Sequence, residues 1–124
     1  SLQAEGLPVE AIALDVTDDA SITAAAEQIA ARHGRLDILV NNAGIFIDDF
    51  QRKPSEQSLE TWRNTFDTNL FGVIAITQAF LPLLRKSEAG RIVNVSSLLG
   101  SIAEHTDPQS PIFEFKMPAY NVSK

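Results

Sequence analysis

The stretch Leu36-Asp37-Ile38-Leu39-Val40-Asn41-Asn42-Ala43-Gly44, residues 36–44, places a nearly continuous apolar run directly before an amide- and glycine-bearing turn. An apolar run without alternating polar residues is typical of a strand that is buried on both faces of a parallel sheet. The turn would then lie at the carboxyl end of the strand, where open α/β sheets bind their ligands. We therefore predict a buried strand over residues 36–40, followed by a turn that faces a ligand.

Two further apolar runs, residues 9–14 and 91–95, predict strands on either side of this one. The first ends at Asp15 and Val16, and the second ends at Ser96 and Ser97. If the three strands are parallel, these polar ends and the turn after residue 40 all lie at one edge of the sheet.

Helical periodicity fills the intervals between the predicted strands. Apolar residues recur at helical spacing over residues 19–33, with Asp18 or Thr17 able to cap the start and Gly34 the end. A longer helical pattern covers residues 58–86, and Pro82 is expected to bend or loosen it. Strands that alternate with helices in this way predict an α/β fold with a parallel sheet and right-handed crossovers.

Composition limits the classes of function. The chain has 124 residues, 44% of them hydrophobic, which fits one globular domain. A net charge of -6 argues against nucleic acid or an anionic membrane as the main partner and favours a small molecule. No apolar run of about 18 residues and no signal peptide is evident, so the expected location is cytoplasmic. With no cysteine and only two histidines, we expect no metal centre.

Tyr120 and Lys124 are four residues apart, so on a helix they share one face. A phenol alone transfers protons poorly at neutral pH, and a nearby ammonium group stabilises its phenolate form. The same spacing also occurs on ordinary solvated helix faces, so the pair alone decides nothing.

Other residues carry similar alternatives. Ser97 could hydrogen-bond a ligand carbonyl oxygen or form a local serine turn. Asn69 lies on the apolar stripe of the long predicted helix, and a buried amide there could be structural or functional. Asp15 could accept a hydrogen bond from a ligand amino group or cap the next helix. The turn that ends at Gly44 could accommodate a ligand or be an ordinary turn.

Taken together and in this order, these segments resemble the short-chain dehydrogenases/reductases. The motifs that carry the resemblance are Asp15-Val16, N-N-A-G at 41–44, T-N-L-F-G at 68–72, R-I-V-N-V-S-S at 91–97 and Y-N-V-S-K at 120–124. They span nearly the whole chain. The N-N-A-G stretch favours the dehydrogenase branch over the extended branch, whose members modify nucleotide sugars and also carry a tyrosine-lysine pair.

The resemblance implies an NAD- or NADP-dependent oxidoreductase that interconverts a carbonyl and an alcohol of a small molecule. Its catalytic tetrad would be Asn69, Ser97, Tyr120 and Lys124. Tyr120 would transfer the proton and Ser97 would orient the carbonyl oxygen, being preferred to Ser96 because the family's serine falls three residues after the strand asparagine, here Asn94. Lys124 would assist Tyr120 and hold the nicotinamide ribose, and Asn69 would bind a water that connects Lys124 to solvent.

The remaining cofactor contacts follow from the same resemblance. Asp15 and Val16 would contact the adenine, and Asn42, Ala43 and Gly44 would line the adenosine side of the cofactor. Homodimers or homotetramers are expected, because the family's long helix commonly packs against a partner subunit and the chain has additional apolar residues there: Leu70, Phe71, Ile74 and Ile76.

The implied fold is a Rossmann-like, doubly wound parallel sheet, here incomplete, with strands three to five of the family's order. The Gly-rich cofactor turn, the strand and charged residues that choose between NAD and NADP, and the carboxyl-terminal strands are not in the chain. We therefore expect residues 1–124 to be the central part of one NAD(P)-binding domain of a longer protein. In the order 3-2-1-4-5, residues 9–14 and 36–40 would lie roughly 14 Å apart.

The long connection before Tyr120 and an alternative function remain to be considered. The connection over residues 98–119 is longer than the family's usual one and contains three prolines, so we expect a loop that either borders the substrate pocket or packs on itself. A dinucleotide-binding regulator without catalysis, or an inactive fragment, is the alternative function. Intact Ser97, Tyr120 and Lys124 argue against the regulator.

Overall fold

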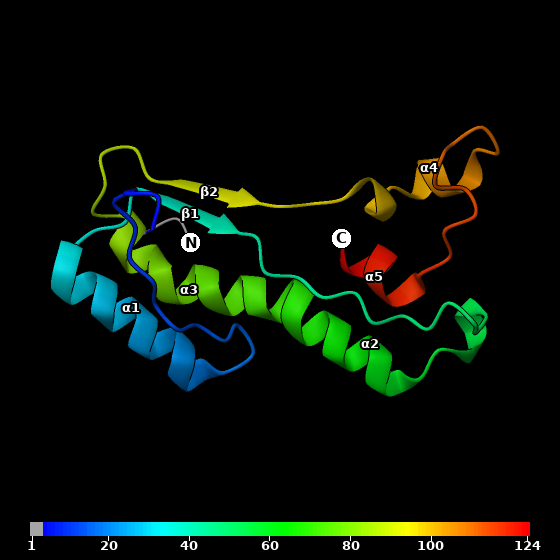
Figure 1. The fold of residues 1–124 in the computed structure, drawn as a ribbon, viewed down its shortest axis with the longest axis horizontal. Helices are drawn as coiled ribbons and strands as arrows, with labels where there is room; N and C mark the ends of the chain where they lie inside the picture. The colour runs from blue at the N-terminus through cyan, green and yellow to red at the C-terminus, as the bar shows by residue number, and fades with distance from the viewer. Residues whose placement is uncertain (1–3) are drawn as a thin grey trace.

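The computed structural model describes residues 4–124 and contains a two-stranded parallel sheet with helices on one side (Figure 1). Its elements, in chain order, are α1 (Asp19–His33), β1 (Ile38–Asn41), the 3₁₀-helix η1 (Pro54–Glu56), α2 (Leu59–Phe66), the π-helical turn η2 (Asp67–Phe71), α3 (Gly72–Leu84), β2 (Arg91–Asn94), the 3₁₀-helix η3 (Leu98–Gly100), α4 (Ile102–Thr106) and α5 (Pro118–Ser123). This order confirms the predicted α/β class.

The two strands pair in parallel over their full length, with Ile38 opposite Arg91 and Asn41 opposite Asn94. Both α1 and α3 lie below the strands in Figure 1, so one face of the sheet is covered. The prediction that the strand over residues 36–40 is buried on both faces is wrong for this chain: Ile38 is 57% and Val40 53% exposed. The apolar sequence of the strand makes it suited to burial on both faces. In the described residues, however, helices cover only one face of the sheet, so the side chains on the other face are exposed.

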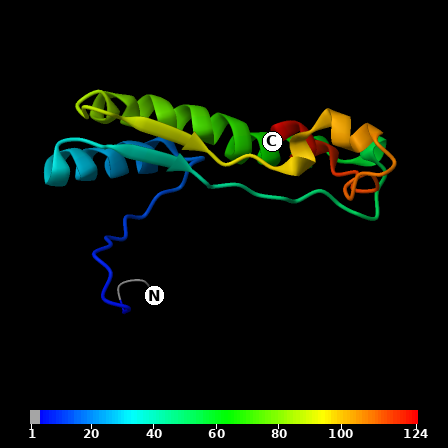
Figure 2. The same ribbon diagram turned by 90° about the horizontal axis from the view of Figure 1, so that it is seen from above.

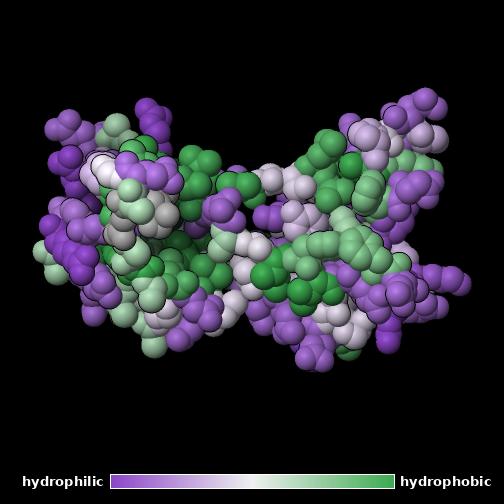
Figure 3. Space-filling model, viewed as in Figure 1, coloured by the Kyte–Doolittle hydropathy of each residue, from purple (hydrophilic) through white to green (hydrophobic). Residues whose placement is uncertain are grey.

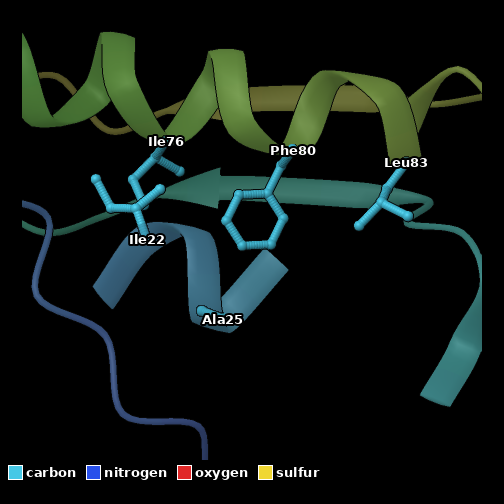
Figure 4. Close-up of a cluster of buried hydrophobic side chains, with 5 residues drawn as sticks. All are labelled: Ile22, Ala25, Ile76, Phe80 and Leu83. Atoms are coloured by element: carbon cyan, nitrogen blue, oxygen red, sulfur yellow. The ribbon is translucent and has the colours of Figure 1, made fainter. Parts of the chain in front are cut away.

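The hydrophobic core lies between α1 and α3, with β1 behind it in the view of Figure 4. Its buried side chains are Ile22, Ala25, Ile76, Phe80 and Leu83. Ile76 was expected to belong to an outward apolar patch, and that expectation is wrong because its side chain packs against α1 and is 4% exposed. Leu70, Phe71 and Ile74 do remain exposed.

The ends of α1 match the prediction, because the signals that set them are local. The Asp18 carboxylate accepts a hydrogen bond from the Ala20 amide at 2.9 Å, which caps the first turn. Gly34 adopts a left-handed conformation with φ of 72° and donates its own amide to the Ala30 carbonyl, as a C-terminal cap does.

The long predicted helix is present as α2, η2 and α3, which form one 26-residue helical stretch from Leu59 to Leu84. A π-helical turn at Asp67–Phe71 interrupts the α-helical hydrogen bonding, and Pro82 lies in the last turns of α3. By length and composition this stretch could cross a membrane. Core helices pass the same test, and Ile76, Phe80 and Leu83 of α3 do belong to the buried core against α1.

Residues 9–14 do not form the predicted strand. A strand needs a hydrogen-bonded neighbour, and the sheet of the described residues consists of β1 and β2 alone. In Figure 2 this part of the chain runs away from the layer of strands. Two open cavities, of about 770 and 320 Å³, separate residues 7–16 from residues 33–43, so the gap expected between the two segments is present.

Residues 98–119 are more regular than the predicted loop, since they contain η3, α4 and the start of α5. Serine caps explain the two short helices. Ser97 accepts a hydrogen bond from the Leu99 amide at 3.2 Å, and Ser101 accepts one from the Glu104 amide at 3.4 Å. This region and α5 form a second lobe, and the surface narrows between it and the lobe that contains the sheet (Figure 3).

Candidate active site

Helix α5 presents Tyr120 and Lys124 together, as their spacing predicts. The helix begins at Pro118, and Lys124 directly follows its last residue. The Lys124 Nζ atom lies 5.9 Å from the centroid of the Tyr120 ring and donates a hydrogen bond to the Val95 carbonyl, just beyond β2, at 3.2 Å. The carboxyl end of β2 therefore holds the ammonium group near the phenol.

Gly44 lies against the same ammonium group from the side of β1. A Cβ atom added at Gly44 would lie 3.1 Å from Lys124 Nζ and 3.4 Å from Asn69 Oδ1, both tight contacts. The glycine therefore lets the backbone that leaves β1 approach the lysine closely. Three of the predicted site residues thus meet at one point, although 80 residues separate the first from the last.

Asn69 is buried at 6% exposure in the π-helical turn, facing inward as its place on the apolar stripe predicts. Its Oδ1 accepts from the Ile45 amide at 2.7 Å, while its Nδ2 donates to the Ile45 carbonyl at 2.9 Å and to Ser123 Oγ at 2.8 Å. Both amide hydrogens are therefore used by protein atoms. A water at this side chain could bind only at the remaining lone pair of Oδ1.

The two adjacent serines after β2 have different surroundings. Ser96 donates its hydroxyl to the Lys124 carbonyl at 3.1 Å. Ser97 caps η3, which packs against α5, so its Oγ accepts from the Leu99 amide while its own hydrogen stays available to another acceptor. Of the two, Ser97 is the one whose hydroxyl hydrogen has no recorded acceptor in the described chain.

Asp15 and Val16 lie where the amino-terminal segment meets the long helix. Val16 and Ala43 line the same small cavity beside Gly72, and a Cβ at Gly72 would come within 2.9 Å of the Val16 side chain. Asp15 is exposed, and its Oδ1 accepts from both the amide and the hydroxyl of Thr17, which lowers the pKa of the Asp15 carboxyl. Asn42 is exposed at the end of β1.

The structure adds residues that the sequence patterns do not single out. The Phe46 ring meets the Tyr120 ring edge to face, with centroids 5.4 Å apart. Asp48 is a buried carboxylate that contacts the start of α5, and Gln57 contacts the backbone of Asp49. For Ser123 a signal exists in the sequence, because it is a hydroxyl residue directly before Lys124. Nothing in the local sequence pattern distinguishes Asp48 or Gln57 from other loop residues.

Known proteins with similar sequences and structures share one family. The family model described as short chain dehydrogenase matches residues 1–108. The short-chain dehydrogenase anuI of Penicillium roqueforti is 44% identical over 117 residues, which cover 91% of this chain and 45% of that protein. The 3-oxoacyl-[acyl-carrier-protein] reductase FabG of Thermotoga maritima is 42% identical over 100 residues, covering 79% of this chain and 39% of that protein.

Among solved structures, the NADPH-bound carbonyl reductase from chicken fatty liver has a TM-score of 0.84 and 29% identity, covering 99% of this chain and 50% of that one. The chain thus spans half or less of the length of each of these relatives. The family model ends before α5, but this structural match extends over nearly the whole chain. The chain belongs to the short-chain dehydrogenase family, and its fold is part of that family's Rossmann-like domain.

Proposed function

We propose that the protein carrying this chain is an NAD(P)-dependent oxidoreductase that interconverts a carbonyl and an alcohol, with Tyr120 as general acid and base. The observation that carries the proposal is the meeting of Tyr120, Lys124 and Gly44 where α5 packs beside the carboxyl ends of both strands. Residues 1–124 would then be the central part of a single cofactor-binding domain.

The residues at this edge fit a nicotinamide cofactor. Asn42, Ala43 and Gly44 are exposed, and Gly44 lies beside the Lys124 ammonium group. That ammonium has three hydrogens, of which Val95 takes one, so two remain for ribose hydroxyls and for the phenol. The exposed Asp15 carboxylate could accept a hydrogen bond from the adenine amino group. When bound, the nicotinamide would supply or accept the hydride.

Each catalytic side chain then has one task. Ser97 donates its hydroxyl hydrogen to the substrate oxygen and fixes its position. During reduction Tyr120 gives its phenolic proton to that oxygen, and during oxidation it takes a proton from the alcohol. Lys124 stabilises the phenolate that forms. Asn69 holds Ile45 and Ser123, and so fixes both sides of the lysine.

We also infer that the protein assembles as a homodimer or homotetramer through the long helix. Leu70, Phe71 and Ile74 are 38 to 56% exposed around the π-helical turn, and apolar side chains grouped on one helix favour contact with a second copy. Sedimentation velocity checks this inference: a Phe71→Glu variant is expected to shift the whole protein toward monomer, and an unchanged association would contradict it.

The central test is Tyr120→Phe in the whole protein. Turnover of NADPH or NADH is measured with a panel of aldehydes, ketones and a 3-oxoacyl thioester, and cofactor binding by titration of nicotinamide fluorescence. The variant is expected to lose at least about 100-fold in kcat, because proton transfer is removed, while cofactor binding changes little. Undiminished turnover would refute the role of Tyr120. Cofactor binding without turnover in the unmodified protein would instead favour a dinucleotide-binding regulator.

A further inference from the structure

Asp48 is a buried carboxylate with no part in the mechanism proposed above. Its side chain lies beside Ala119, and the residue is 7% exposed. Its Oδ1 accepts a hydrogen bond from the Ala119 amide at 2.9 Å, and its Oδ2 accepts one from the Tyr120 amide at 3.0 Å. A carboxylate is costly to bury unless its oxygens are hydrogen-bonded, and here both oxygens are bonded to the helix that carries the phenol.

These two bonds complete the amino-terminal end of α5. The first amides of a helix have no partner inside it, and Met117, at the capping position, provides no side-chain cap. Pro118 has no amide hydrogen, and the Asn121 amide already bonds the Met117 carbonyl at 2.8 Å. Ala119 and Tyr120 therefore carry the amides that need partners. Asp48 supplies both, from 71 and 72 residues away in the chain.

The segment that carries Asp48 is itself fixed at both ends by side-chain amides. At Ile45, the Asn69 amide bonds both the backbone N–H and the carbonyl. At Asp49, Gln57 does the same, accepting from the amide at 3.0 Å and donating to the carbonyl at 2.6 Å. Each side chain thus satisfies the amide and the carbonyl of one residue, as a partner strand would, and so fixes residues 45–49 at both ends.

The same short segment also fixes the ring of Tyr120. Phe46 lies between the two amide-bonded positions, and its ring meets the Tyr120 ring at 72° with centroids 5.4 Å apart. Asp48 thus holds the backbone of Tyr120, and Phe46 contacts its side chain. An edge-to-face pair restricts the ring, whereas the two backbone bonds determine where the helix starts.

We propose that Asp48 is a positioning residue for proton transfer: by bonding the Ala119 and Tyr120 amides, it sets the placement of the Tyr120 phenol relative to the substrate oxygen. This inference rests on the proposed function. A displacement of about 1 Å in a catalytic group can cost about 100-fold in rate, so loss of this anchor acts mainly on kcat. Substrate and cofactor contacts that do not involve α5 remain.

The test compares Asp48→Asn with Asp18→Ala in the whole protein. The Asp48→Asn change keeps the shape of the side chain but turns an NH₂ group toward one of the two amides, so one bond is lost and two donors face each other. Asp18 caps α1, which carries no proposed catalytic residue, so Asp18→Ala removes a helix cap without touching α5. Both variants are measured well below their melting temperatures.

For Asp48→Asn we expect kcat to fall about 10- to 100-fold, with KM and the NADPH dissociation constant within about twofold of the unmodified protein. Asp18→Ala should lower the melting temperature and leave kcat within about twofold. Equal kcat values for Asp48→Asn and the unmodified protein would overturn the inference. So would equal losses of kcat in both variants, since that result would reflect stability alone.

Amide hydrogen exchange separates this inference from the proposed function, because it requires no substrate. The amides of Ala119 and Tyr120 should exchange faster in Asp48→Asn, while those of α1 stay unchanged. Unchanged exchange at these two amides overturns the inference, whatever the activity. A fully active Tyr120→Phe protein would overturn the proposed function, and faster exchange in Asp48→Asn would then still support the anchoring of α5.

Discussion

The segments that follow the two strands differ in the sequence distance of the residues that fix them. After β1, residues 42–49 are fixed by side chains from other elements: Asn69 lies 24 residues from Ile45, and Asp48 reaches α5 across 71 residues. After β2, residues 97–117 are fixed largely by their own neighbours, as Ser110 donates to Glu104 and His105 bonds the Leu99 carbonyl, each six residues away. The path of the first segment therefore depends on distant parts of the fold, while the second is held mostly by contacts that are close in the sequence.

The two segments therefore differ in how much of each can vary without moving the candidate site. The segment after β1 contacts Lys124 through Gly44 and Tyr120 through Phe46, so any change in its path is passed to the site. The segment after β2 meets the site at its start, where Ser97 lies and Gly100 packs against Lys124. Beyond Ser101 it extends away from the sheet into the second lobe (Figures 1 and 3), where its bonds close on themselves. An enlarged connection is tolerated there because it disturbs few distant contacts.

The largest expected effect on stability comes from Asn69→Leu. The variant keeps the branched shape and the number of heavy atoms of the side chain but leaves the Ile45 amide, the Ile45 carbonyl and Ser123 Oγ without this partner. Since each unsatisfied buried polar group costs about 1–3 kcal/mol, we expect the free energy of unfolding of the whole protein to fall by about 2–4 kcal/mol. Urea denaturation measures this, with Asn64→Leu on the exposed face of α2 as the matched control.

The control is expected to stay within about 0.5 kcal/mol of the unmodified protein. Equal losses for Asn69→Leu and Asn64→Leu would show that the segment after β1 does not depend on its distant partner. The proposed difference between the segments after β1 and β2 would then be contradicted where the largest effect is expected.

A smaller effect is expected at the other end of the same segment. Gln57→Ala removes both bonds to Asp49, which lies closer to solvent than Ile45, so we expect a loss of about 1–2 kcal/mol. Ser110→Ala, in the segment after β2, removes the bond to Glu104 and should cost less than about 1 kcal/mol. Urea denaturation of both variants compares the segments after β1 and β2 directly. A larger loss for Ser110→Ala would reverse the proposed difference.

Local patterns in the sequence predict the elements whose causes are local. The Asp18 cap and Gly34 determine the ends of α1, and helical spacing from Leu59 to Leu84 determines the long helix. The meeting of Tyr120 and Lys124 also follows from a spacing of four residues. In each case the residues that decide the structure lie within a few positions of the residues that adopt it.

The failures of prediction involve features that depend on partners far away in the sequence or on neighbouring strands. Residues 9–14 have the composition of a strand, but their pairing depends on neighbouring strands and not on their own side chains. Ile76 looks the same in sequence as Ile74, and only the packing of α1 decides which one is buried. Asp48 looks like an ordinary loop residue, because its two partners lie more than 70 residues further along the chain.

The smallest expected effect concerns Asp15, whose bonds are as local as those after β2. Thr17 donates both its amide and its hydroxyl to Asp15 Oδ1, and these bonds hold the pKa of the Asp15 carboxyl below its ordinary value. Thr17→Val removes the hydroxyl and keeps the amide, so the pKa of Asp15 should rise part of the way back. Carbon NMR titration of the carboxyl groups measures it, with Thr23→Val on α1 as a control that leaves Asp15 untouched.

The sign of the linked stability change follows from the lowered pKa. A carboxyl whose pKa is lower in the folded state contributes stability above the pKa of the unfolded chain, and this is lost as the pH falls through the folded pKa. Thr17→Val should therefore lose less stability on acidification than the unmodified protein. An unchanged Asp15 pKa in the variant would contradict this. Because Asp15 is exposed, the shift stays small, as expected of a contact that closes within three residues.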